Sequence, residues 1–221
     1  GDAWIVSTAS RKDIFKDSSG SIPERFTPYD KDELKRAFDA LSPVGDPSAE
    51  LCLSVGTWDV SRVTDMRNMI ADAKSFNKDL SKWDTRRVTR MQGMFYEARA
   101  FNGDLSRWDV SRVTKMSEMF SGAKSFNSDL SEWNVARVDS MNWMFHKASA
   151  FNGDLSKWNV GKVTDMQGMF RQASAFNRDL SKWNVGKVTD MSFAFREGGA
   201  FFFFYGEGVC LKCVFFFLST L

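Results

Sequence analysis

The stretch LSRWDVSRVTKMSEMFSGAKSFNSD, residues 105–129, decides the fold because its pattern recurs every 25 residues along most of the chain. We number positions within a repeat from its leucine, so that tryptophan occupies position 4 and phenylalanine position 22. All 11 methionines fall at positions 12 and 15. Aromatic residues repeated at a fixed period indicate a repeat protein, in which a unit buries its apolar face only against its neighbours. The tryptophan column comprises Trp58, Trp83, Trp108, Trp133, Trp158 and Trp183.

The first half of the repeat has the spacing of a short strand. Leu105, Trp108 and Val110 match the L-x-x-L-x-L pattern of leucine-rich repeats, whose periods run from about 20 to 29 residues. Trp108 and Val110 alternate with Arg107 and Asp109, as expected of a strand with one buried face. The pattern predicts a strand here.

The second half of the repeat has helical spacing. Val113, Met116, Met119 and Phe120 are separated by three, three and one residues, and this spacing predicts a helix or a 3₁₀-rich helical turn. Thr114 is the expected N-cap.

The expected fold is therefore an α/β repeat, a right-handed leucine-rich-repeat-like solenoid with short parallel strands and a helical turn in each 25-residue coil. Residues 54–201 are expected to form this solenoid, with five full coils and a degenerate sixth. Each large apolar side chain buried between coils contributes about 1.5–3 kcal/mol, so that a sizeable core forms without disulfides.

Two segments precede the repeats. Residues 1–29 are expected to be an N-terminal segment and linker, without a recognisable secretory signal. Residues 30–53 are expected to form a helical cap and loop, with the helix over residues 30–41. Its apolar face comprises Leu34, Ala37, Phe38 and Leu41, and Asp30 or Asp32 caps its start.

Residues 202–221 form a Phe-rich tail that departs from the repeat pattern. Three interpretations stay open: a cap over the end of the solenoid, a truncated or misassigned end of the coding sequence, or an anchor. Glu207 and Lys212 interrupt the apolar run, which disfavours membrane insertion. Cys210 and Cys213 form a lone C-x-x-C without a zinc ligand set or a thioredoxin-like context.

The composition limits the chemistry. His146 is the single histidine among 221 residues, so a multi-histidine metal site is excluded, and three cysteines cannot form a disulfide framework. The 30 basic and 28 acidic residues nearly balance, so the net charge does not predict nucleic-acid binding. No catalytic triad, phosphate-binding loop or dinucleotide motif is present. We therefore expect no enzyme, no cofactor and no bound metal.

The repeats resemble those of BspA-like leucine-rich repeat surface proteins, in particular the 25-residue subfamily called DUF285. The resemblance lies in WDVSRVTDMRNM at 58–69, LSRWDVSRVTKMSEMF at 105–120 and FNGDLSKWNVGKVTDMQGMF at 151–170, and it covers residues 55–201. It implies a surface-exposed or secreted interaction protein and supplies no catalytic residue to carry over.

One candidate binding surface is the outer face of the predicted strands. Parallel strands along one side of a curved stack form the usual binding surface of such repeats. The alternative is a solvated face that binds no partner. The outward residues are Lys82, Asp84, Arg107, Asp109, Glu132, Asn134, Lys157, Asn159, Lys182 and Asn184.

A second candidate is a column of basic residues at position 8, which we call the basic column. Stacking would align these side chains for a phosphate or a sulfated glycan. The alternative is a salt-bridged rim, in which the acidic residues Asp59, Asp84 and Asp109 neutralise the column. The basic column comprises Arg62, Arg87, Arg112, Arg137, Lys162 and Lys187.

Asparagine and aspartate also form columns, at positions 23 and 25. Their oxygens could hold calcium between coils. The stronger interpretation is that they satisfy backbone groups at the same turn in every coil. The aspartate column comprises Asp79, Asp104, Asp129, Asp154 and Asp179.

The sequence thus predicts a non-enzymatic interaction solenoid that presents an extended face to a protein or glycan partner. The alternative function is a structural spacer without a tight ligand. Nucleic acid is not an expected partner, and a location at the cell surface follows from the resemblance alone.

Overall fold

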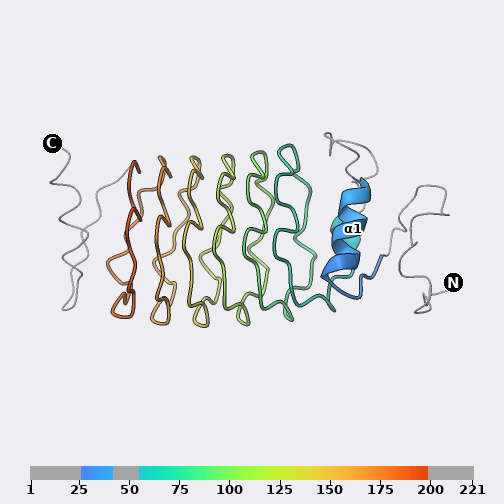
Figure 1. Cartoon of the computed structure of the whole chain (residues 1–221), viewed down its shortest axis with the longest axis horizontal. Helices are drawn as coiled ribbons and strands as arrows, with labels where there is room; N and C mark the ends of the chain where they lie inside the picture. Colours follow the sequence, from blue (N-terminus) through green and yellow to red (C-terminus); the bar gives the residue numbers. More distant parts are fainter. Residues whose placement is uncertain (1–25, 42–54, 199–221) are drawn as a thin grey trace.

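The computed structural model describes residues 26–41 and 55–198. One α-helix, α1 (Lys31–Leu41), is followed by coils that stack side by side along one axis (Figure 1). We number these coils 1 to 6, beginning at residues 55, 80, 105, 130, 155 and 180. Residues 1–25 of the predicted N-terminal segment, the 42–53 loop, the 202–221 tail and the C-x-x-C lie outside the described residues. The end of the predicted linker is described, and there Phe26 is buried with its ring 5.1 Å from that of Trp58 in coil 1.

Neighbouring coils are joined by parallel β-bridges at position 11, directly before the first methionine. The bridges run through Asp65, Arg90, Lys115, Ser140, Asp165 and Asp190. They are single-residue bridges, and no longer strand is formed within the described coils. Thr89 N–H donates to Thr64 C=O at 2.8 Å beside one such bridge, which ties the backbones of coils 1 and 2 together.

The prediction of a strand at L-S-x-W-x-V is wrong, because this segment turns too sharply. In coil 3 the Trp108 N–H donates to Leu105 C=O at 3.1 Å, within its own turn. The inter-coil bond is made by the side chain instead: Trp108 Nε1 donates to Leu80 C=O of the preceding coil at 3.0 Å. The alternation of buried and exposed residues is nevertheless present, with Trp108 buried and Arg107 exposed.

The prediction of a helical second half, capped by Thr114, is also wrong for the described coils. The backbone at positions 14 and 18 has positive φ, for example 58° at Glu118 and 74° at Gly122, which no right-handed helix contains. The apolar spacing of three and four arises from successive tight turns, such as Met119 N–H to Met116 C=O at 3.2 Å. Helical spacing in the sequence is therefore produced here by a chain of turns.

These turns form a second inter-coil ladder, which we call the ladder face and define as positions 11 to 18. Alternate N–H groups of one coil donate to carbonyls of the next coil: Met116 to Ser140 at 3.0 Å, Glu118 to Asn142 at 2.9 Å and Phe120 to Met144 at 2.9 Å. Because these bonds satisfy the buried backbone, the side chains of positions 12, 15 and 16 can fill the interior.

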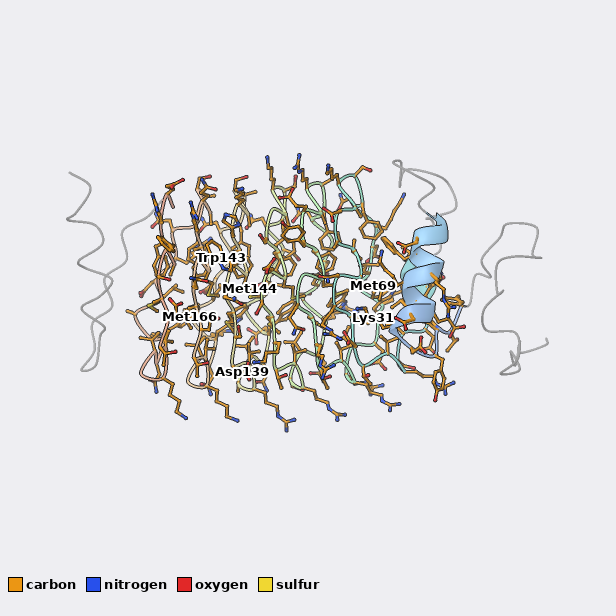
Figure 2. All side chains as sticks on the ribbon, viewed as in Figure 1. Lys31, Met69, Asp139, Trp143, Met144 and Met166 are labelled. Atoms are coloured by element: carbon orange, nitrogen blue, oxygen red, sulfur yellow. The ribbon has the colours of Figure 1, made fainter. Side chains whose placement is uncertain are left out.

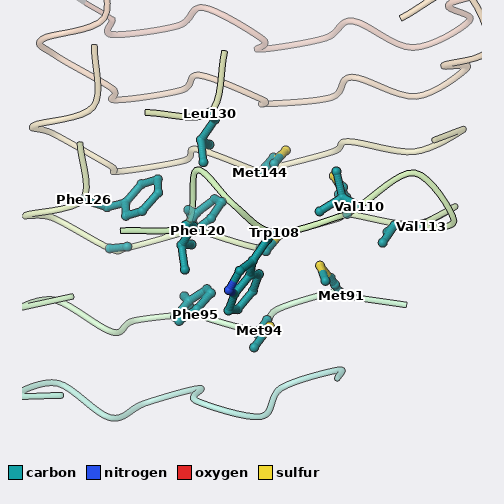
Figure 3. Close-up of a cluster of buried hydrophobic side chains, with 14 of the residues drawn as sticks. Met91, Met94, Phe95, Trp108, Val110, Val113, Phe120, Phe126, Leu130 and Met144 are labelled. Atoms are coloured by element: carbon teal, nitrogen blue, oxygen red, sulfur yellow. The ribbon is translucent and has the colours of Figure 1, made fainter. Parts of the chain in front are cut away.

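The interior consists of the repeated columns. In Figure 3 the side chain of Trp108 lies near Met91 and Met94 of the preceding coil, and the rings of Phe120 and Phe126 lie side by side. The rings stack in parallel: Phe101 and Phe126 are 6.1 Å apart with planes 7° apart, and Phe120 and Phe126 are 4.0 Å apart. Unbranched methionine side chains fill the gaps beside the rings. The core thus runs continuously from coil to coil.

Helix α1 covers the first coil. Its cap is Asp30, whose Oδ1 accepts from the Glu33 N–H at 2.9 Å, while Glu33 Oε2 accepts from the Tyr29 N–H at 2.7 Å. This arrangement differs from a capping box by one residue, because Glu33 accepts from the N–H of Tyr29 and not from that of the cap residue Asp30. Leu34, Ala37 and Phe38 are buried, and the Phe38 ring lies 5.2 Å from that of Phe76. The helix therefore shields an apolar end that a stack of repeats otherwise exposes.

Candidate functional site

The predicted strand face is exposed except for Asp84, which is half-buried. Its position-5 residues are turn formers, since each side-chain oxygen accepts from the backbone N–H two residues on. Asp109 Oδ1 accepts from Ser111 at 2.9 Å, and Asn159 Oδ1 accepts from Gly161 at 3.2 Å. Half of the predicted face, namely Asp84, Asp109, Asn134, Asn159 and Asn184, is engaged in this way.

The position-3 residues of the same face are Lys82, Arg107, Glu132, Lys157 and Lys182. Glu132 pairs with Lys157 of the next coil at 2.5 Å, with both side chains largely exposed. An exposed pair of this kind contributes little to stability because solvent screens it. The structure thus brings these residues into one row but makes no continuous strand beneath them.

The basic column is exposed along its full length, at Arg62, Arg87, Arg112, Arg137, Lys162 and Lys187. The coils stack at a regular spacing, as the distances between position-22 phenylalanine rings of neighbouring coils show: they range only from 5.8 to 6.1 Å. Position 8 occurs once in each coil, so its residues form one row along the stack. Figure 2 shows long nitrogen-tipped side chains projecting in a row along the lower edge of the stack, where Asp139 is labelled.

The three aspartates expected to neutralise the basic column interact with other groups instead. Asp84 holds Arg86, with Oδ2 to Nη2 at 2.6 Å, and hydrogen bonds from the Arg86 side chain lower the pKa of Asp84. Asp59 and Asp109 accept from Ser61 and Ser111 backbones. Across the described ranges 26–41 and 55–198, no salt bridge forms to any residue of the basic column. The guanidinium of Arg62 instead lies 4.5 Å from the Tyr29 ring centroid.

The asparagine column acts as a ladder between coils. Asn127 Oδ1 accepts from the Asn152 N–H at 2.8 Å, and the same bond recurs between the other coils. In the aspartate column, Asp104 Oδ1 accepts from Ser106 N–H at 2.9 Å. Hydrogen bonds from the following serine lower the pKa of Asp79, Asp104, Asp154 and Asp179.

Both columns therefore serve the backbone, as the stronger interpretation of the sequence predicts. Among the residues that the structure describes, no group of three or more His, Cys, Asp or Glu side chains is placed to hold a metal ion. The same residues contain no helix with the length and apolar character needed to span a bilayer.

A cluster on the ladder face was not singled out from the sequence. It is built by Trp143, His146, Arg171 and Phe193, all half-buried. The Trp143 and His146 rings meet edge to face at 5.1 Å, and Trp143 Nε1 lies 3.2 Å from Gln167 Oε1. We call these four residues the ladder-face cluster. The available signal was that Trp143 lies outside the tryptophan column, at a position where other coils carry asparagine, glycine, glutamate or phenylalanine.

His146 makes stability depend on pH. Burial, followed by the charges of Lys147 and Arg171, lowers its pKa below 6.5, and its Nδ1 lies 3.3 Å from Ser121 Oγ. Between its lowered pKa in the folded state and about 6.5, His146 thus binds fewer protons in the folded state than in the unfolded state, so we expect stability to fall as the pH drops through this interval.

We expect His146→Ser, which copies Ser121 of the preceding coil, to remove this contribution. Urea unfolding followed between neutral pH and mildly acidic pH should give a smaller loss of stability for the variant than for the wild type. Parallel curves for the two proteins would contradict the assignment.

The comparisons with known proteins identify the family. A family model described as "Mycoplasma protein of unknown function, DUF285" matches residues 33–144 and 104–202. No curated protein and no solved structure matches the chain. The two family matches together run from the first turn of α1 through the described part of coil 6, which is more than half of the chain. The chain therefore belongs to the DUF285 family.

Proposed function

We propose that the coil stack is a non-enzymatic interaction scaffold, a solenoid of the BspA-like leucine-rich repeat type, that binds an extended anionic partner along the basic column. The observation that carries the proposal is the row of exposed cations at position 8, none of which forms a salt bridge with another residue that the structure describes. The partner is a protein segment or a glycan that carries repeated negative charge.

Like charges aligned at the coil spacing repel one another, at a cost of about 1 kcal/mol for a pair 4 Å apart in water and less at longer range. The fold does not require this arrangement, because position 8 is solvated and contributes nothing to the core. An anionic ligand would relieve the repulsion and bind several side chains at once, which favours a repeating ligand over a single ion.

The charge of this surface is not uniform along the stack. At position 5, three residues before the basic column, coils 1 to 3 carry aspartate and coils 4 to 6 carry asparagine. The surroundings of Arg137, Lys162 and Lys187 are therefore less acidic than those of Arg62, Arg87 and Arg112. We expect an anionic partner to favour the end formed by coils 4 to 6.

The test compares two triple variants that lose the same charge. Arg137→Gln, Lys162→Gln and Lys187→Gln together remove the half of the basic column that lies in coils 4 to 6, whereas Lys74→Gln, Lys124→Gln and Arg178→Gln remove three exposed cations elsewhere. Binding of the full chain to heparin and to polyglutamate is measured by calorimetry at several salt concentrations. We expect the column variant to bind at least one of these probes about tenfold more weakly, with a shallower salt dependence, and the control to bind almost as the wild type does.

Equal weakening by the two variants would mean that only the net charge matters. Absence of binding by the wild type to both probes would favour a structural spacer. Thermal unfolding of both variants should stay close to that of the wild type, since exposed substitutions change stability by about 0.5 kcal/mol or less.

A further inference from the structure

The ladder-face cluster brings an aromatic ring and a guanidinium to one place on coils 4 to 6. The Trp143 ring lies against the backbone of Gly168, where a Cβ atom would come within 2.3 Å of the ring. The guanidinium carbon of Arg171 lies 5.9 Å from the Trp143 ring centroid and 5.8 Å from that of Phe193. Because Gly168 has no side chain, the indole of Trp143 fits beside the guanidinium of Arg171.

The guanidinium of Arg171 has unused hydrogen-bonding capacity. Its Nε is buried and forms no hydrogen bond in the described part of the chain. Its nearest carboxylate, Glu197, lies 3.9 Å away and also approaches Arg196 at 3.3 Å and accepts from Gln172 at 2.5 Å. One carboxylate is therefore shared among several donors, and Arg171, Arg196 and the exposed Lys147 leave an excess of positive charge here.

The backbone around the cluster is already paired. Trp143 N–H donates to Gln167 C=O at 2.7 Å, and Lys147 N–H donates to Arg171 C=O at 2.8 Å. A peptide strand that bound here could not add to the ladder through these groups. A ligand at this site would therefore be recognised by side chains, namely the Trp143 ring and the Arg171 guanidinium beside it.

We propose that the ladder-face cluster binds a carboxylated sugar unit of an acidic glycan. The apolar face of the sugar ring packs on the half-buried Trp143 side chain. The sugar carboxylate accepts hydrogen bonds from the Nη groups of Arg171, of which Nη2 comes no closer than 3.9 Å to the Glu197 carboxylate. Guanidinium and carboxylate match in geometry and charge, and such bonds are stronger than those between neutral groups. A ring with an apolar face and an attached carboxylate fits this juxtaposition better than a simple anion does.

This site is distinct from the basic column. Trp143 lies well inside the outline of the stack in Figure 2, whereas Asp139, two residues after Arg137, lies at the lower edge. The two sites share no residue, so each can fail without the other.

The experiment uses the full chain and three variants. Trp143→Asn copies Asn68, which occupies the same position in coil 1 with φ of 55°, and Arg171→Gln removes the charge. Tyr96→Ser is the matched control, because it removes a half-buried aromatic residue of the ladder face outside the cluster and copies Ser121. The probes are an oligogalacturonate, a neutral malto-oligosaccharide of equal length and polyglutamate.

We expect calorimetry to show oligogalacturonate binding that is at least about tenfold weaker in Trp143→Asn and in Arg171→Gln and unchanged in Tyr96→Ser. The neutral sugar and polyglutamate should each compete at least about tenfold less well. The ligand-induced change in tryptophan fluorescence should disappear in Trp143→Asn, and the basic-column triple variant should retain both signals.

The proposal is overturned if the wild type does not bind oligogalacturonate, or if Trp143→Asn and Arg171→Gln bind it as tightly as the wild type. It is also overturned if the neutral sugar or polyglutamate binds equally well, since the ring and the carboxylate are both required. Loss of binding in the basic-column variant alone would assign the glycan to the basic column instead.

Discussion

Trp133→Ala is expected to lower the free energy of unfolding by about 3–5 kcal/mol, as a buried large-to-small substitution. Trp133 is 3% exposed, its ring stacks on that of Trp158 at 6.5 Å, and its Nε1 donates to Leu105 C=O at 3.0 Å. Alanine would leave a cavity between coils 3 and 5 and an unsatisfied carbonyl within the stack. Urea unfolding measures the change.

A pair of phenylalanine variants separates the two contributions. Trp133→Phe keeps an aromatic ring but loses the inter-coil hydrogen bond, so we expect about 1 kcal/mol more destabilisation than for Trp58→Phe. Trp58 is equally buried, yet its Nε1 has no hydrogen-bond partner within the described residues. The exposed Lys124→Ala should change stability by about 0.5 kcal/mol or less. A similar loss of unfolding free energy for Trp133→Ala and Lys124→Ala would contradict the conclusion that the tryptophan column stabilises the stack.

The inward columns could be predicted from the sequence, but the path of the backbone could not. Burial follows the identity of each column: tryptophan, valine, methionine and phenylalanine are inside whether the backbone is a helix or a chain of turns. A spacing of three and four fits both, because tight turns also return a residue to the same side after three positions. The distinguishing signal is positive φ at positions 14 and 18.

That signal is faint in the sequence. Glycine or asparagine marks it at Asn68, Gly93, Gly122 and Gly168, whereas Trp143 and other large residues adopt positive φ at the equivalent places. Side chains rarely adopt this conformation unless the surrounding structure imposes it. Inter-coil hydrogen bonds impose it here, and these involve residues about 24 positions apart, so local sequence patterns do not reveal them.

The candidate sites differ in the same way. The basic column could be predicted because a fixed period places its members in one row. The ladder-face cluster could not, because Trp143, Arg171 and Phe193 stand at variable positions of three different coils. Their proximity depends on the turns that bring positions 14 and 17 of neighbouring coils together.

Removal of one whole coil is the second large test, because it probes the repeat itself. Deletion of residues 142–166 joins Met141 to Gln167 and preserves the M-x-x-M spacing. Every column then stays in register, and Glu118 N–H meets the Gln167 carbonyl in place of that of Asn142. We expect cooperative urea unfolding with lower stability and a smaller m-value, as for a repeat array shortened by one unit.

Deletion of residues 142–165 differs from it by one residue, since Met166 is retained. Met141 and Met166 become neighbours, so the sequence reads M-M-x-x-M through Met141, Met166 and Met169, and the ladder face gains an extra residue. Alternate N–H groups then no longer face their carbonyl partners, and each lost hydrogen bond lowers stability by about 0.5–1.5 kcal/mol. At least one methionine also leaves the core, which lowers stability by about 1.5–3 kcal/mol more. Because a domain is stable by only about 5–15 kcal/mol, we expect a much lower unfolding midpoint or no cooperative transition. Equal midpoints for the two deletions would show that the ladder does not fix the register. Failure of the 142–166 deletion to unfold cooperatively would show that the coils are not interchangeable units.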